Sequence, residues 1–398
     1  MSPFARNRLL TCLFFPKNPS SSPCTKSLIH FSLNFSTNTE KNPANAPTVY
    51  DFLIHKHNFS HKSASQIASV VTRLRNPERS ESTLAFLKAS GFSNSQLEKI
   101  LTYRPRYLSS NLEKVIKPKL KVLRDFGFSA NETADIISKS PSILYCSADN
   151  RLIPSLAVLE GLLGSKSEVA RLLRVTGWFL VTDLRKTLVP NFEFLKSCGV
   201  NVDRMITFMR IFPRLLLQKP EILESFVEKV DSMGVKKGSG MFIYAVRVIS
   251  SMNKEAWEIK LRTFRDLGFS ENDITRVFRH APMVFSVSAE KIMKITKVLV
   301  GTGKYDMGCI LNSPTSLLYS VETRYGPRLR VLGVLEKRGV IKVWPSLGML
   351  HLVSDDKFYL KYVAPYLDDE EMIVAWGPIL SKSRMKVKIN KELSCFSP

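Results

Sequence analysis

A glycine and a proline that recur fourteen residues apart constrain the fold of this chain more than any other feature. The residues 6, 9 and 10 positions after each glycine are mainly apolar, which is the spacing of one face of an α-helix. Each proline is expected to end that helix, because it has no N–H to donate and disfavours a helical residue before it. The four pairs are Gly91 and Pro105, Gly127 and Pro141, Gly199 and Pro213, and Gly268 and Pro282.

The segment that follows Gly268 shows the whole pattern. Ile274, Val277 and Phe278 form its apolar stripe, while Ser270 and Asp273 stand where an N-cap residue and its acidic partner would stand. We therefore expect one capped amphipathic helix with an apolar inner face and a basic outer face in each such segment.

Weaker copies of the pattern fill the gaps between the four strong ones. They begin at Gly164 and Gly234 and near Met307, and a partial copy follows Gly339. From Gly91 to Gly268 the starting glycines step by 34 to 37 residues. A period of this size is typical of a solenoid of helical repeats.

A second series of prolines runs in phase with the first. Pro118, Pro154 and Pro190 are each 36 residues apart, and an apolar helical pattern follows each of them. Proline is tolerated in the first turn of a helix, so these residues are expected to open a second helix in each repeat. The sequence therefore predicts an all-α fold, a superhelical α-solenoid of about seven to eight helical repeats of about 35 residues that bury their apolar faces on one another.

The charge of the chain indicates a polyanionic partner. The 398 residues have a formal net charge of +23 at pH 7. Residues 1–39 hold four basic and no acidic residues, which leaves an excess of 19 positive charges in the rest of the chain. An excess of this size favours association with a polyanion, although a solvated charged face that only maintains solubility is the alternative.

The N-terminal composition predicts a targeting segment. Residues 1–38 are rich in serine, contain arginine and lysine and lack acidic residues, as organellar transit peptides do; a secretory signal is the rival interpretation. We expect a helical lead-in over 39–82, the repeats over 83–366 and a C-terminal tail over 367–398. The six cysteines form no CxxC pair and the longest apolar stretch, 241–252, is too short to span a membrane.

The phase of these motifs resembles one known family. The Gly-Phe-Ser start, the mid-repeat Pro-x-x-Leu and the later proline series are similar to those of the mitochondrial transcription termination factor (mTERF) family, in particular its plant organellar branch. "GFSANETADIISKSPSIL" followed by "LIPSLAVL" is one example. The resemblance implies a superhelix of three-helix units whose positively charged concave surface holds nucleic acid, in the mitochondrion or alternatively in the chloroplast.

Basic residues recur near the end of the first helix of each repeat. In a solenoid, equivalent positions line up along one surface, and arginine can donate a forked pair of hydrogen bonds to phosphate oxygens. Cations near a helix C-terminus also offset the helix dipole, which is the structural alternative. The candidate nucleic-acid-binding residues are Arg104, Arg106, Lys139, Arg174, Arg210, Arg214, Arg247, Arg279, His280, Arg324 and Arg328.

The chain shows no motif of a catalytic or metal site. It has no glycine-rich phosphate loop, no HExxH and no GxSxG, so we expect neither an enzyme nor a cofactor. His55, His57 and His61 cluster in the lead-in, but a solvated surface accounts for them better than a metal site.

Three functions are open at this point. The leading hypothesis is an organellar protein, monomeric and without a membrane segment, that binds double-stranded DNA through phosphates and regulates transcription, at termination or a related step. The second is an organellar RNA-binding factor for intron splicing or ribosome biogenesis. The third is a protein-interaction scaffold whose groove holds a peptide or helix.

Overall fold

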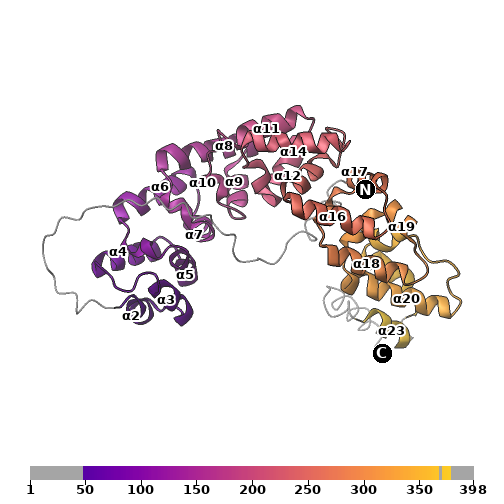
Figure 1. Cartoon of the computed structure of the whole chain (residues 1–398). Helices are drawn as coiled ribbons and strands as arrows, with labels where there is room; N and C mark the ends of the chain where they lie inside the picture. The colour runs from indigo at the N-terminus through magenta and orange to yellow at the C-terminus, as the bar shows by residue number, and fades with distance from the viewer. Residues whose placement is uncertain (1–47, 367–369, 378–398) are drawn as a thin grey trace. The chain divides into compact units, whose positions relative to one another are not determined.

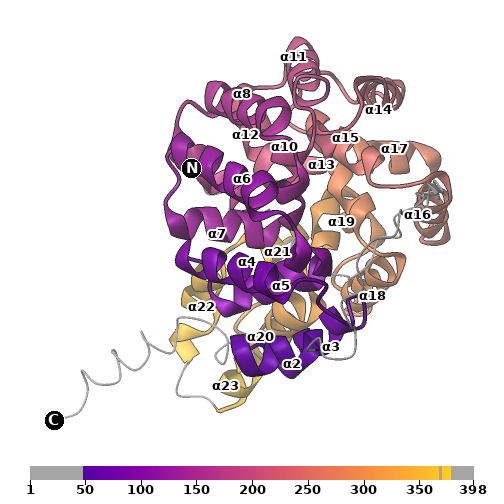
Figure 2. The same cartoon turned by 90° about the vertical axis from the view of Figure 1, so that its left-hand side faces the viewer.

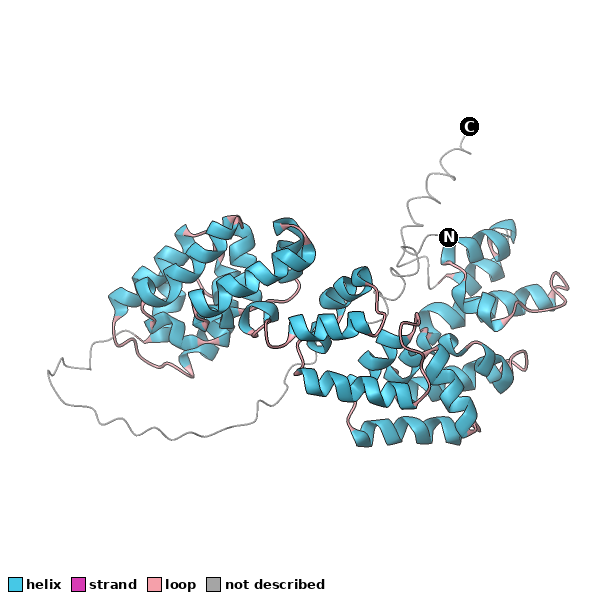
Figure 3. Cartoon of the chain, turned by 90° about the horizontal axis from the view of Figure 1, so that it is seen from above, coloured by secondary structure: helices cyan, strands magenta, loops and turns pink. Residues whose placement is uncertain are grey.

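The computed structural model describes residues 48–366 and 370–377 of the chain. The predicted transit peptide and most of the predicted C-terminal tail lie outside these residues. Within them all regular secondary structure is helical (Figure 3), apart from one isolated bridge between Thr48 and Arg73. The predicted all-α fold is confirmed.

The described residues group into two compact units, which we call the N-terminal unit (48–224) and the C-terminal unit (225–377). Figure 1 labels their helices. The helical elements up to the boundary are α2 Val49–Asp51, η2 Phe52–Lys56, α3 His61–Ala68, α4 Pro77–Ala89, α5 Asn94–Tyr103, η3 Pro105–Ser109, η4 Leu112–Ile116, α6 Lys117–Phe126, α7 Ala130–Lys139, η5 Pro141–Tyr145, η6 Ala148–Leu152, α8 Ile153–Leu163, α9 Lys166–Leu173, α10 Trp178–Val181, α11 Leu188–Ser197, α12 Val202–Ile211 and α13 Pro213–Leu216.

Helix α14, Pro220–Ser232, contains the boundary between the two units. The elements after it are α15 Phe242–Ser250, α16 Lys254–Asp266, α17 Glu271–His280, η7 Pro282–Ser286, α18 Ala289–Val300, α19 Met307–Asn312, η8 Pro314–Leu318, η9 Val321–Tyr325, α20 Gly326–Lys337, α21 Leu347–Leu352, α22 Asp355–Tyr362, η10 Ala364–Tyr366 and α23 Glu370–Trp376.

A typical repeat consists of a first helix, a short helical turn that begins at the proline, and a second helix. Pro105, Pro141 and Pro282 begin such turns, directly after the helices α5, α7 and α17 have ended. Pro118 and Pro154 lie in the first turns of the second helices α6 and α8, as predicted. Figures 1 and 2 show these repeats following one another in chain order within the N-terminal unit.

Local hydrogen bonds explain where the first helices begin. Ser270 accepts a hydrogen bond from the backbone N–H of Asp273, and the carboxylate of Asp273 accepts one from the backbone N–H of Ser270. Reciprocal caps of this kind also start α5 and α7, which confirms the predicted helix starts. Gly127 ends α6 with a φ of +112°, a left-handed conformation that a residue with a Cβ adopts only under strain.

The predicted apolar stripes face the interior of each unit. Ile274, Val277 and Phe278 of α17 are all buried, as are the equivalent residues of α5, α7, α9 and α12. In the weaker copy after Gly234, the sequence predicts a stripe of Met241, Tyr244 and Ala245. Met241 is instead 37% exposed, because α15 begins only at Phe242 and buries that residue.

Polar side chains of several second helices bind backbone carbonyls near the end of the next repeat's first helix or proline turn. Asn191 of α11, for example, donates from Nδ2 to the carbonyls of Leu216 and Gln218, at 3.0 and 2.8 Å. Burial of a carbonyl without a partner costs free energy, so these donors stabilise the junctions between repeats. We call these side chains the second-helix donors; they are Ser80, Asn191, Lys260, Lys291 and Arg328.

Candidate nucleic-acid interface

Five of the predicted cations lie exposed at one edge of the N-terminal unit. Arg104 caps the C-terminus of α5, Lys139 ends α7 and Arg174 caps the C-terminus of α9. Arg106 and Arg214 belong to the proline turns that follow α5 and α12. We call these five residues the basic edge.

Contacts between neighbouring repeats hold the members of the basic edge next to one another. The Nζ of Lys139 donates to the carbonyl oxygen of Arg174 at 2.7 Å. The guanidinium of Arg104 lies 5.4 Å from the ring centroid of Tyr145, which ends the proline turn of the next repeat. The C-terminal ends of successive first helices therefore adjoin, as expected for equivalent positions in a repeat fold.

The carboxylates that flank Arg174 in sequence have other partners. Glu168 forms ion pairs with Arg171 and Arg210, and Asp183 lies 3.2 Å from Arg151. Within 48–366 and 370–377, no carboxylate forms an ion pair with a residue of the basic edge. Its positive charge is therefore not compensated by described residues of the protein itself.

Exposed aromatic rings accompany these cations. Tyr103 is 56% exposed and Tyr145 is 52% exposed, and the guanidinium of Arg104 lies near both rings. Trp178 is 38% exposed, with the guanidinium of Arg214 at 4.5 Å from its ring centroid.

Tyr107, an aromatic residue near the same edge, has a structural role instead. It is fully buried, and its hydroxyl donates to the carbonyl oxygen of Pro141 at 2.6 Å. This burial raises the pKa of the Tyr107 phenol well above its usual range. The residue therefore joins two proline turns rather than offering a ring to a ligand.

Arg210 differs from the members of the basic edge because a carboxylate neutralises it. Its guanidinium pairs with Glu168 of the preceding repeat, and its side chain is 33% exposed. This ion pair between repeats leaves Arg210 less available to a polyanion than Arg174, which is its equivalent one repeat earlier.

The predicted residues in the first part of the C-terminal unit are also engaged with their own protein. Arg247 is half-buried and donates to the hydroxyls of Ser251 and Ser286, and burial lowers its pKa. Arg279 is exposed, and its Nε donates to the carbonyl oxygen of Met233 at 2.9 Å. His280 is exposed at the end of α17.

Arg324 and Arg328 are not surface residues, contrary to their selection from the sequence. Arg328 has no exposed surface, and it donates to the carbonyls of Leu350 and Val353 and to the carboxylate of Asp355. Arg324 is 9% exposed and pairs with the same carboxylate. Burial lowers the pKa of Arg328 to about 10, which still leaves it charged at neutral pH. Neither guanidinium can reach a phosphate, and both act within the protein.

The histidine cluster of the lead-in is not simply a solvated surface. His55 and His61 are exposed, but His57 is buried beside the ring of Phe52 and its Nε2 lies 3.3 Å from Oε2 of Glu81. In the part of the chain that the structure describes, no group of three or more His, Cys, Asp or Glu residues could hold a metal ion. No helix in that part is long and apolar enough to cross a membrane.

Tandem pairs of helices separated by a proline turn place the chain in the class of helical-repeat proteins. It belongs to the mTERF family, whose model matches residues 39–235 and 231–359. The helical-repeat fold of this family agrees with the fold of the chain.

A curated relative is the mitochondrial transcription termination factor MTERF15 of Arabidopsis thaliana. The two proteins are 22% identical over 233 residues, which cover 50% of this chain and 51% of the relative. The match thus spans about half the length of either protein.

Proposed function

We propose that the chain binds double-stranded DNA in an organelle through its basic edge and regulates transcription there, at termination or a related step. The proposal rests on the basic edge, whose five cations are exposed on adjoining repeats. No carboxylate among the described residues neutralises them. They are Arg104, Arg106, Lys139, Arg174 and Arg214. A row of cations of this kind suits the regularly spaced phosphates of a nucleic-acid backbone.

Binding through phosphates determines what the basic edge can and cannot do. Each arginine can donate two hydrogen bonds to one phosphate group, which positions the protein on the duplex without reading the base sequence. Sequence preference would then come from other contacts or from the shape of the duplex. The protein acts by binding alone, as a monomer and without a cofactor.

The organelle that we favour is the mitochondrion, with the chloroplast as the alternative. Two observations support an organellar location: the acid-free, serine-rich composition of residues 1–38, and the mitochondrial name of the Arabidopsis relative. Imaging of the full chain fused to a fluorescent protein, beside markers of both organelles, tests this part of the proposal.

The binding proposal is tested by fluorescence anisotropy with the full chain and labelled duplexes of DNA and RNA that share one sequence. We expect the DNA duplex to bind more tightly, and both to dissociate as the salt concentration rises. Equal and weak binding of both, with no dependence on salt, would support a protein-interaction scaffold instead.

RNA is the second candidate ligand, and the exposed rings of Tyr103, Tyr145 and Trp178 favour it. Unpaired bases stack on aromatic side chains, whereas the bases of a duplex are already stacked on each other. Trp178→Ala should therefore weaken the binding of single-stranded RNA about tenfold and leave duplex DNA nearly unchanged. If the binding of single-stranded RNA and of duplex DNA weakened by the same factor, Trp178 would act by packing against Arg214 and not by stacking on a base.

A further inference from the structure

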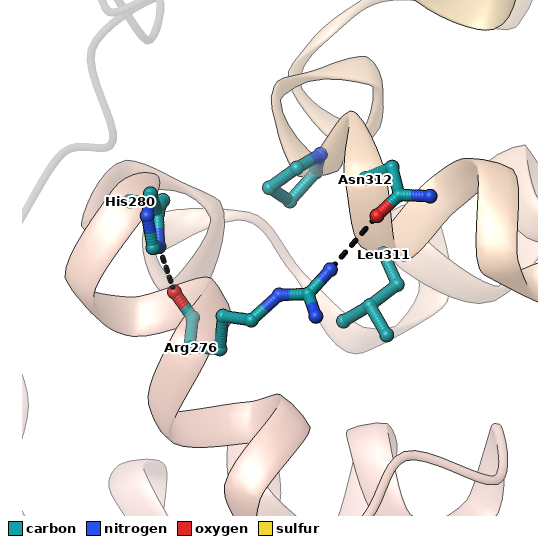
Figure 4. Close-up of a pocket in the computed structure, with 5 residues that line it drawn as sticks. Arg276, His280, Leu311 and Asn312 are labelled. Atoms are coloured by element: carbon teal, nitrogen blue, oxygen red, sulfur yellow. Dashed lines mark hydrogen bonds between the residues drawn. The ribbon is translucent and has the colours of Figure 1, made fainter.

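A cleft opens in the C-terminal unit between the ends of α17 and α19 (Figure 4). Arg276 and His280 from α17, Leu311 and Asn312 from α19, and Pro314 at the start of η8 line it. Its volume is about 180 Å³. Of these residues, only His280 is among the candidates predicted from the sequence, where it is expected to contact a phosphate.

Two hydrogen bonds determine which atoms the cleft offers to a ligand. Arg276 donates from Nη2 to Oδ1 of Asn312 at 2.8 Å, so the amide nitrogen of Asn312 remains as a donor. Nδ1 of His280 lies 2.8 Å from the carbonyl oxygen of Arg276. A carbonyl only accepts, so Nδ1 carries a proton, and in the tautomer with a single proton Nε2 is an acceptor. The cleft therefore presents donors from two residues and an acceptor from a third.

The size of the cleft suits one six-membered ring. A buried apolar cavity of about 150 Å³ binds benzene, so a volume of about 180 Å³ holds a single ring with polar substituents but is small for two fused rings. Leu311 and Pro314 supply apolar walls. The guanidinium of Arg276 and the imidazole of His280 are planar groups on which a ring can stack.

The C-terminal end of α17 lies beside the cleft. The last carbonyls of α17 have negative partial charge. This partial charge, about half an elementary charge, offsets part of the charge of Arg276. A heterocycle with acceptor oxygens and one N–H on its edge matches the donors of Arg276 and Asn312 and the acceptor of His280.

We propose that this cleft binds a single unpaired pyrimidine base of a nucleic-acid strand. The proposal rests on the proposed nucleic-acid binding and adds a position of base preference to it. Because each pyrimidine has at least one acceptor oxygen and one hydrogen-bond donor on a six-membered ring, N3–H in uracil and the N4 amine in cytosine, it fits both the size and the polar groups of the cleft. A purine would have to leave its second ring outside.

The test measures the affinity of the full chain for short oligomers of uridine, cytidine and adenosine, with Asn312→Leu and Arg276→Lys as variants. We expect the native chain to bind both pyrimidine oligomers about tenfold more tightly than the adenosine oligomer, the size of one charge-assisted hydrogen bond. Both variants should lose this preference. Arg276→Lys keeps the charge but loses the planar group, so retention of the preference in this variant would indicate a phosphate contact and overturn the proposal.

Arg262→Lys is the matched control, because Arg262 is an exposed arginine on the neighbouring helix α16 and does not line the cleft. It should keep the full pyrimidine preference. Duplex DNA binding, measured in parallel, should be unchanged in all three variants. A chain that binds the duplex but shows no base preference refutes the cleft proposal alone, whereas a chain that binds neither duplex nor oligomers refutes the proposed function as well.

Discussion

Replacement of Arg106, Arg174 and Arg214 by alanine should weaken duplex binding and flatten its dependence on salt. These three side chains are exposed and form no ion pair among the described residues, so their removal leaves no carboxylate without a partner. Each phosphate contact contributes a slope of about −0.9 to the plot of log K against log salt concentration. The five cations of the basic edge together predict a slope of about −4.5, and the loss of three predicts about −1.8.

These slopes separate widely in a simple titration. Between about 50 and 200 mM salt, the affinity of the native chain should fall about 500-fold and that of the variant only about 12-fold. Fluorescence anisotropy with one labelled duplex over a series of salt concentrations measures both slopes. Circular dichroism melting should give the same midpoint for both proteins, since exposed substitutions change stability by about 0.5 kcal/mol or less.

A second variant removes the same number of positive charges from the second helices. Lys88, Lys121 and Lys196 are exposed residues of α4, α6 and α11, outside the basic edge. Lys121 and Lys196 pair with Asp125 and Glu193 of their own helices, so this control also shows what the loss of exposed ion pairs does. Replacement of the three lysines by alanine should leave the slope nearly unchanged. If this control flattens the slope as much as the edge variant, net charge alone attracts the duplex and the basic edge is not an interface.

Three further predictions concern stability. Arg328→Met should destabilise the fold by about 3–5 kcal/mol, because it leaves buried carbonyls and the carboxylate of Asp355 without this donor. Gly177→Ala should cost about 1–3 kcal/mol, because the added Cβ would lie 2.5 Å from Cβ of Ser140, and Ser140→Gly should restore part of the loss. Burial lowers the pKa of His351 to about 4 from the ordinary histidine value of about 6.5. As the pH falls, the unfolded chain therefore takes up a proton first, and stability present above pH 6.5 should decrease by about 3 kcal/mol as the pH drops toward 4.

Thermal melting measures all three effects. For the pH effect, the midpoints of the native chain and of His351→Gln are compared between pH 7.5 and 4.5, and the variant should show the smaller decrease. An equal decrease in both would show that other groups cause the acid sensitivity. A stable Arg328→Met protein, with a melting midpoint like that of Arg262→Ala, would contradict the structural role of the buried guanidinium.

The helix boundaries could be predicted from sequence because they depend on residues within one turn of each other. Ser270 and Asp273 start α17, and Pro282 follows its end, all within the range of local hydrogen bonds and steric contacts. The buried stripes follow from the same periodicity. These features are properties of short segments, so no knowledge of the partner repeat is needed to recognise them.

The roles of individual cations could not be predicted in this way. Arg328 is a further candidate cation of the last repeats, but it lies in the first turn of the second helix α20. Asp355 and the carbonyl of Leu350, which come from the next repeat, accept its hydrogen bonds in the interior. Arg279 likewise finds the carbonyl of Met233, 46 residues away. A pattern of positive charges shows where cations recur, whereas the contacts between repeats decide which of them face solvent.

The second-helix donors make the repeats of this chain non-interchangeable. Serine, asparagine, lysine and arginine differ in length, and each spans the particular gap between its own helix and the carbonyl in the repeat that follows. Each of these five donors precedes its acceptor in the chain, so the junctions that they join have a direction. If a repeat were moved to another position, its donor side chain would have the wrong length for the carbonyl of the repeat that follows. Its own carbonyl would likewise not match the donor of the repeat before it. The order of the repeats therefore depends on the identity of a few polar side chains between them.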